Sequence, residues 1–286
     1  MTDEKKSALK RIVIFTFLAF LPAYVIQLCL FKDGGAEHRF ISNLVMMTPA
    51  AANILTRLIT KDGSDTLLRI NFRGNGKYYI AALLYPLILS ALNAAAGILF
   101  LVKDHSFENS VLNNNIPQSI YMLLFPTAAG AVTFFICWGE EFGWRGYLTP
   151  QLEKLMSKPA AMCVSGVIWG LWHAPAVSQG LNFGKDYPLE PFSGIAVMCV
   201  SCIFYGILLS WLTEKTGSIL PAAICHSCVD MASNTFSNLL IPPGSEYKYN
   251  DFYSGLVYVC IAAAVVSVWM AVIVIRRKQH GGQIEV

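Results

Sequence analysis

The stretch FFICWGEEFGWRGYL, residues 134–148, places two adjacent acids, Glu140 and Glu141, and the base Arg145 at the end of a strongly apolar segment. An ionised carboxylate at membrane depth is costly, so acids inside a membrane usually face a cavity, have a partner and mark a functional site. The interpretation of both acids therefore depends on whether this segment lies in a membrane.

The composition indicates that it does. Of the 286 residues, 55% are hydrophobic and only 14% are charged, whereas about 25% of the residues of a soluble protein are charged. We therefore expect an all-α, polytopic membrane helix bundle that forms a single transmembrane domain, residues 1–286. The net charge of +3 is small, and the basic residues lie in short loops and at both ends. This pattern is typical of membrane topology and argues against a nucleic-acid partner.

Apolar stretches long enough to span a bilayer predict about eight transmembrane helices. They are residues 12–31, 41–60, 78–102, 117–139, 160–177, 191–212, 218–241 and 252–275. The first stretch is longer than the apolar core of a signal peptide, so we interpret it as a retained helix. The basic loops fall on one side together with both termini, which predicts cytoplasmic termini. The modest length and the absence of targeting extensions favour an integral protein of a prokaryotic cell membrane.

Two roles are expected for the three charged residues of the stretch 134–148. On a helix, Glu141 and Arg145 are four residues apart and can form an ion pair that supports the site. Glu140 points about 100° away on the same helix, which leaves it available as a general base.

Leucines at helical spacing after Arg145 predict that this helix continues inward towards Lys154, although Pro150 could break it. Glu140 then lies as far from Lys154 as His173 lies from Lys158 on the next predicted helix. We therefore expect Glu140 and His173 to meet at the same depth, with Pro175 ending or kinking the second helix.

A third helix carries His226, Asp230 and Asn234 at intervals of four residues, which places them on one face. Histidine and aspartate at this spacing can share a metal ion or orient a water molecule or a substrate carbonyl. Each polar residue alone is explained by packing, but their presence on three helices favours a functional site. The tryptophans and cysteines are interpreted as packing or interface residues: Trp138, Trp144, Trp169, Trp172, Trp211, and all eight cysteines, including the Cys225 and Cys228 pair.

These motifs resemble those of the CPBP family of intramembrane proteases, which includes CAAX prenyl protease type 2 and bacteriocin-processing or immunity proteins. Glu140, Glu141 and Arg145 match its Glu-Glu-x-x-x-Arg motif, Trp169 and His173 its aromatic-x-x-x-His motif, and His226 with Asp230 a variant of its His-x-x-x-Asn motif. The resemblance covers residues 117–241, the expected catalytic core.

The resemblance implies a membrane-embedded endopeptidase in which Glu140 and His173 activate water and His226 with its partner stabilises the oxyanion. Its substrate would be a membrane-associated protein cut near its C-terminus, prenylated CAAX proteins included, or a bacteriocin-like peptide. Asp230 departs from the family pattern, because an ionised aspartate cannot donate a hydrogen bond as asparagine can. It is therefore protonated, orients His226 or binds metal.

Two mechanisms follow. In the first, which is slightly favoured, no cofactor is needed and Glu140 moves the proton itself. In the second, a zinc ion lowers the pKa of the attacking water, and its candidate ligands are Glu140, His173, His226 and Asp230.

Two other functions use the same residues. An immunity or scaffold protein would bind a peptide in the same cavity without cutting it. A transporter would use the acids and histidines as a proton relay, but the repeated, broken half-helices typical of many transporters are not evident. The expected partners are the lipid bilayer and a peptide or lipidated protein, while the sequence carries no signal for an oligomeric state.

Overall fold

The computed structural model describes residues 2–30 and 43–279, and these residues form helices and no named strand. The helices are α1 (Asp3–Leu30), α3 (Thr48–Thr60), α4 (Gly76–Ala96), α5 (Val111–Asn114), α6 (Ile116–Val132), α7 (Phe135–Gly143), α8 (Thr149–Glu153), α9 (Lys158–Trp172), α10 (Ala174–Ser178), α11 (Phe192–Thr216), α12 (Leu220–Ala232), α13 (Thr235–Leu240) and α14 (Asp251–Gln279). Three further helical segments are the π-helices η1 (Gly97–Leu101) and η3 (Trp144–Leu148) and the 3-10 helix η2 (Phe107–Asn109). The predicted all-α membrane fold is confirmed.

Within the described residues, four helical segments are long and apolar enough to cross a membrane: Asp3–Cys29, Gly76–Leu101, Phe192–Thr216 and Asp251–Ile273. The pair Ile116–Val132 and Phe135–Glu153 is bent by 55° and adds a fifth if it is counted as one span. The predicted spans 41–60, 160–177 and 218–241 instead contain α3, α9 and α12, which have only 13, 15 and 13 residues. Residues 41 and 42 lie outside the described part of the chain. The predicted number of about eight spans is thus not confirmed.

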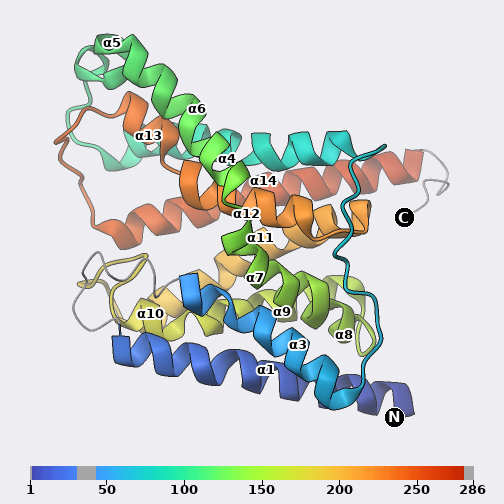
Figure 1. Ribbon diagram of the computed structural model, residues 1–286. Helices are drawn as coiled ribbons and strands as arrows, with labels where there is room; N and C mark the ends of the chain where they lie inside the picture. The colour runs from blue at the N-terminus through green and yellow to red at the C-terminus, as the bar shows by residue number, and fades with distance from the viewer. Residues whose placement is uncertain (1, 31–42, 280–286) are drawn as a thin grey trace.

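The chain termini and the loops that connect the helices lie at two opposite ends of the bundle. In Figure 1 the start of α1 and the end of α14 lie at the same end, where the segment between α3 and α4 also runs. The start of α9 meets the end of α11 through an ion pair between Lys158 and Glu214. The connections from α4 to α6, from α10 to α11 and from α13 to α14 lie at the opposite end (Figure 1). This is the grouping of loops that the sequence predicts.

The predicted fourth helix is broken earlier than expected. The α-helical pattern stops at Val132 and resumes at Phe135. From there the chain stays helical through η3 and α8 as far as Glu153, so the helix does continue past Arg145. Pro150 does not break it because it lies in the first turn of α8, where a proline is tolerated.

Glycines bring neighbouring backbones into contact around the polar stretch. A Cβ atom at Gly143 would lie 2.3 Å from Cβ of Pro49, and one at Gly139 would lie 2.7 Å from a backbone oxygen of Met46. These two glycines thus permit close approach of another segment, as expected for small residues between membrane helices. Gly146, in contrast, has Phe142 of the preceding turn as its nearest neighbour.

A similar contact joins α9 to α11. A Cβ atom at Gly166 would lie 2.5 Å from Cα of Ile203, and one at Gly170 would lie 2.4 Å from Cα of Cys199. Real Cβ atoms do not approach this closely, so both positions require glycine. The backbones of the two helices are therefore in contact in the last two turns of α9, just before it ends at Trp172.

Candidate active site

The two acids of α7 have separate surroundings, as predicted. The fully buried Glu141 accepts a hydrogen bond at Oε1 from Arg145, whose Nη1 lies 3.1 Å away. Nδ1 of His226 lies 2.8 Å from the same oxygen. The ion pair of Glu141 and Arg145 is present, and His226 joins it. The guanidinium of Arg145 also lies 4.1 Å from the ring centre of Trp169, a cation–π contact.

Glu140 is 2% exposed and has a different set of partners. Its Oε2 accepts a hydrogen bond from Nε1 of Trp169 at 2.6 Å, and Nε1 of Trp144 lies 3.4 Å from the same oxygen. Its Oε1 has no hydrogen-bond donor among the described residues. The sequence predicts only packing for these two tryptophans, so their indole N–H groups were missed as partners of Glu140. The spacing of four residues from Glu140 to Trp144 was the available signal.

His173 lies at the end of α9, which stops at Trp172 just before Pro175. Nδ1 of His173 is 3.0 Å from the carbonyl oxygen of Trp169. Because a carbonyl only accepts, Nδ1 carries the hydrogen, and Nε2 of the neutral ring is left as an acceptor. Within the described chain no hydrogen bond joins His173 directly to Glu140. Trp169 instead contacts both, through its indole and its carbonyl.

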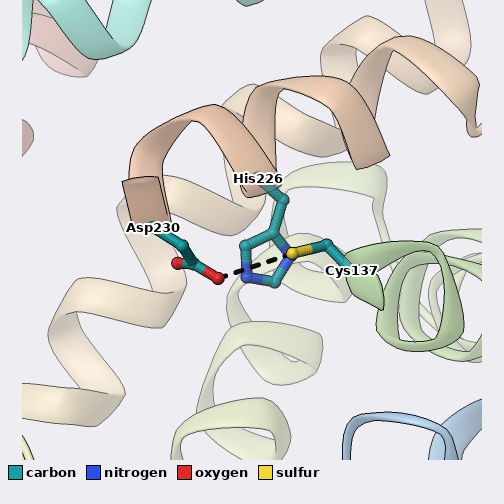
Figure 2. Close-up of side chains that lie close together, drawn as sticks. All are labelled: Cys137, His226 and Asp230. Atoms are coloured by element: carbon teal, nitrogen blue, oxygen red, sulfur yellow. Dashed lines mark hydrogen bonds between the residues drawn. The ribbon is translucent and has the colours of Figure 1, made fainter. Parts of the chain in front are cut away.

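Cys137 of α7 forms a cluster with His226 and Asp230 of α12. The ligand atoms of Cys137, His226 and Asp230 all lie within 4.8 Å of one another. Figure 2 shows Cys137 reaching this cluster from α7, with a thiol that donates to Oδ2 of Asp230 at 3.4 Å. The sequence predicts Cys137 only as a packing residue, although it lies three residues before Glu140 on the same helix. Of the four predicted zinc ligands, the structure places His226 and Asp230 in this cluster.

The cluster is chemically suited to zinc. Thiolate, imidazole and carboxylate are all zinc ligands, and three protein ligands leave one position for water. A zinc-bound histidine usually donates its other N–H to a carboxylate, as His226 does to Glu141. The metal-dependent alternative is therefore compatible with these residues, with Cys137 in place of Glu140 and His173.

A cavity of about 810 Å³ connects the polar groups. Trp169, His173, His226, Asp230 and Asn234 all line it. The prediction of one helix face holds for His226 and Asp230 but is wrong for Asn234, because α12 ends at Ala232 and Asn234 lies in the turn before α13. Glu140 is not among the described residues that line the cavity, but it accepts a hydrogen bond from Trp169, which is. The cavity is large enough for several residues of a peptide, with the histidines and Asp230 at one part of its wall.

Residues 120–232 match the model of a protein family described as type II CAAX prenyl endopeptidase Rce1-like. This segment is Rce1-like. The Rce1-like segment contains all three motifs and lies within the predicted core, residues 117–241, so the family resemblance is confirmed. None of the curated proteins compared with the chain matches it. Together with the apolar helices, the Rce1-like match supports an integral membrane protein and, in general terms, a CAAX-type intramembrane endopeptidase.

Proposed function

We propose that the protein hydrolyses a peptide bond near the C-terminus of a membrane-associated protein or a bacteriocin-like peptide, with Glu140 and His173 activating the water. One observation carries this proposal: Trp169 bonds both Glu140 and His173 and leaves each with one available acceptor, Oε1 and Nε2. We propose that these two acceptors, both on groups bonded to Trp169, share one water molecule.

The proposed reaction begins with a water molecule that donates one hydrogen bond to Oε1 of Glu140 and the other to Nε2 of His173. As the water oxygen bonds to the substrate carbonyl carbon, its proton moves to Glu140. The C–N bond then breaks, and Glu140 returns the proton to the leaving amine. The carboxylate is regenerated, and no cofactor is consumed.

The developing oxyanion needs a hydrogen-bond donor. His226 is paired through Nδ1 with Glu141 and, as an imidazolium, carries a second N–H at Nε2 that can donate to the oxyanion. Arg145 shares Glu141 with His226 and holds this carboxylate in place. We assign Asp230 the role of orienting His226.

Zinc is the alternative means of activating water. Cys137, His226 and Asp230 would hold the ion, which would supply a water of lowered pKa. We favour the metal-free route because this ligand set leaves Glu140 and His173, to which the family resemblance assigns the activation of water, without a chemical role.

The test is a cleavage assay on purified protein, with the substrate identified by trapping. Glu140→Gln should retain bound peptide that mass spectrometry can sequence, and neither Glu140→Gln nor His173→Ala should cleave it. Glu108→Gln makes the same chemical change at an exposed position and should cleave normally. Full activity of either site variant would overturn the assignment. Binding without cleavage by the unmodified protein would favour the scaffold function.

A further inference from the structure

The chain departs from α-helical bonding at His173. α9 ends at Trp172, and α10 begins at Ala174 with Pro175 in its first turn. A proline has no N–H, and its ring collides with the carbonyl group four residues earlier, which here belongs to Leu171. A continuous helix therefore cannot pass through this point, and α10, beyond the break, lies against α1 (Figure 1).

The break takes the helical donor from two successive carbonyl groups. In a continuous helix each carbonyl accepts from the N–H four residues later. The residue four after Leu171 is the proline, and the N–H of Ala176 does not donate to the carbonyl of Trp172. Regular bonding then resumes, because the N–H of Val177 lies 3.0 Å from the carbonyl oxygen of His173. Since backbone groups away from water need partners, these two carbonyls require donors from outside the helix.

Two side chains of α1 take the place of the missing helical bonds. The hydroxyl of Tyr24 donates to the carbonyl oxygen of Leu171 at 2.7 Å. The amide of Gln27 bridges the next pair: its Nε2 lies 3.4 Å from the carbonyl oxygen of Trp172, and its Oε1 accepts from the N–H of Ala176 at 3.0 Å. Gln27 is only 2% exposed, and it lies three residues after Tyr24, on the same face of α1. One buried amide thus joins the donor and the acceptor that a continuous helix would join directly.

The turn before the break is tightened, and this tightening provides the partner of His173. The N–H of His173 bonds the carbonyl of Gly170, three residues earlier, as in a 3-10 turn. The carbonyl of Trp169, which this N–H would bond in an α-helix, instead accepts from Nδ1 of the imidazole at 3.0 Å. The broken helix therefore supplies the acceptor that keeps the hydrogen on Nδ1 and leaves Nε2 to accept.

We infer that Gln27 is a positioning residue for His173, and that α1 thereby belongs to the active-site structure. This inference deepens the proposed function and rests on it. Gln27 acts through the backbone on either side of the histidine, at Trp172 and Ala176. α1 lies outside residues 120–232, which match the family model. The matched segment thus carries the chemical groups but takes part of its geometry from α1.

Loss of the Gln27 amide should change the tautomer of His173. It leaves the carbonyl of Trp172 and the N–H of Ala176 without partners, and the direct bond between them is the simplest replacement. That bond rebuilds a helical turn across His173 and withdraws the carbonyl of Trp169 from its ring. An imidazole that is not held exchanges between its two neutral tautomers, and the one with its hydrogen on Nε2 cannot accept from the attacking water.

Nitrogen NMR of isotope-labelled histidine tests this expectation without any substrate. The signals of His173 in the detergent-solubilised protein are identified by their loss in His173→Gln. We expect the unmodified protein to hold the hydrogen on Nδ1 alone and Gln27→Leu to show both tautomers. Gln151→Leu is the matched control, because Gln151 is an equally buried glutamine whose amide bonds Asp62 instead. It should keep the single tautomer. If Gln27→Leu does not fold, Gln27→Glu, which has the same shape but loses the Nε2 donor, replaces it.

The kinetic arm uses a farnesylated, internally quenched peptide that ends in a CAAX sequence. Because small displacements of a reacting group cost up to about 100-fold in rate, Gln27→Leu should lower kcat roughly 10- to 100-fold with little change in KM. Gln151→Leu should keep the kcat of the unmodified protein.

A single Nδ1–H tautomer in Gln27→Leu, or the same loss of this tautomer in Gln151→Leu, would overturn the inference. The expected spectra without cleavage by the unmodified protein would reject the proposed function alone. Cleavage with an unchanged spectrum and an unchanged kcat in Gln27→Leu would reject the positioning role alone.

Discussion

Nε1 of Trp169 lies 2.6 Å from Oε2 of Glu140, while the carbonyl of the same residue is 3.0 Å from Nδ1 of His173. A single residue therefore fixes the orientation of both groups that we propose to activate water. In the family motif that this chain resembles, the aromatic residue before the histidine is usually phenylalanine, which has no N–H to donate. The tryptophan here adds a hydrogen bond to an aromatic position.

Replacing Trp169 by phenylalanine tests this role. A hydrogen bond to a charged group contributes about 1.5–3 kcal/mol, so Trp169→Phe should lower kcat roughly 10- to 100-fold with little change in KM. Trp138→Phe is the control, because Trp138 stacks on Phe142 and donates no hydrogen bond to either acid. Equal kcat values for the two variants would show that the indole N–H does not position Glu140.

Glu141 should matter for stability as well as activity. Glu141→Gln leaves both Arg145 and His226 without their buried carboxylate. Removing one partner of a buried ion pair costs about 3–5 kcal/mol, so thermal unfolding in detergent should shift strongly downwards.

The control for that substitution is Glu246→Gln, which removes the exposed ion pair with Lys103. Exposed pairs contribute up to about 1 kcal/mol, and its unfolding temperature should stay close to that of the unmodified protein. Similar melting curves for Glu141→Gln and the unmodified protein would contradict the supporting role of Glu141.

Metal removal separates the two routes to hydrolysis. On the metal-free route, dialysis against a chelator leaves cleavage unchanged and Cys137→Ala stays active. On the zinc route, both treatments abolish cleavage, and metal analysis of the purified protein gives about one zinc per chain, which Cys137→Ala loses. Cys228→Ala is the control for replacing a buried cysteine, since Cys228 lies outside the cluster of Cys137, His226 and Asp230. We expect the results of the metal-free route, in which the chelator leaves cleavage unchanged and Cys137→Ala stays active.

Asp62 should make stability depend on pH. It is buried after the end of α3, accepts a hydrogen bond from Gln151 at 2.9 Å and lies 3.3 Å from Nε of Arg11. Burial alone would raise the pKa of Asp62, but hydrogen bonds from Ser64 and the charge of Arg11 outweigh it and hold the pKa below the ordinary 3.8.

A carboxyl group whose pKa is lowered by folding stabilises the protein above its unfolded pKa, and this contribution is lost as the pH falls through the folded pKa. Asp62→Asn should therefore lower the unfolding temperature at neutral pH, and its difference from the unmodified protein should shrink below pH 3.8. The control is Asp65→Asn, which removes an exposed ion pair with Arg69. A difference that does not change with pH would contradict the role of the Asp62 charge.

The sequence predicts the chemistry of the site better than the lengths of its helices. The i,i+4 spacing of Glu141 and Arg145 predicts their contact correctly because it depends on a single turn of one helix. Hydropathy could not predict that α3, α9 and α12 are short, since apolar residues precede the start of α3 at Thr48 and follow the ends of α9 and α12 at Trp172 and Ala232. The break after Val132 was missed for the same reason.

Local sequence patterns also could not predict the contacts between helices. The bonds from Trp169 to Glu140 and from Cys137 to Asp230 join segments that are 29 and 93 residues apart. Their side chains resemble ordinary packing residues in an apolar segment. Only the folded arrangement, which brings side chains of α7, α9 and α12 together, turns them towards the acids.

The glycines that join α9 to α11 also determine the height of His173 in the bundle. With Gly166 and Gly170 in contact with Cα atoms of Ile203 and Cys199, α9 cannot slide along α11 by one residue without forcing a side chain into the backbone. The position of His173 along α11 is therefore fixed by the protein itself. Bilayers of different thickness should change how the whole bundle sits in the lipid, but not the height of His173 relative to α11.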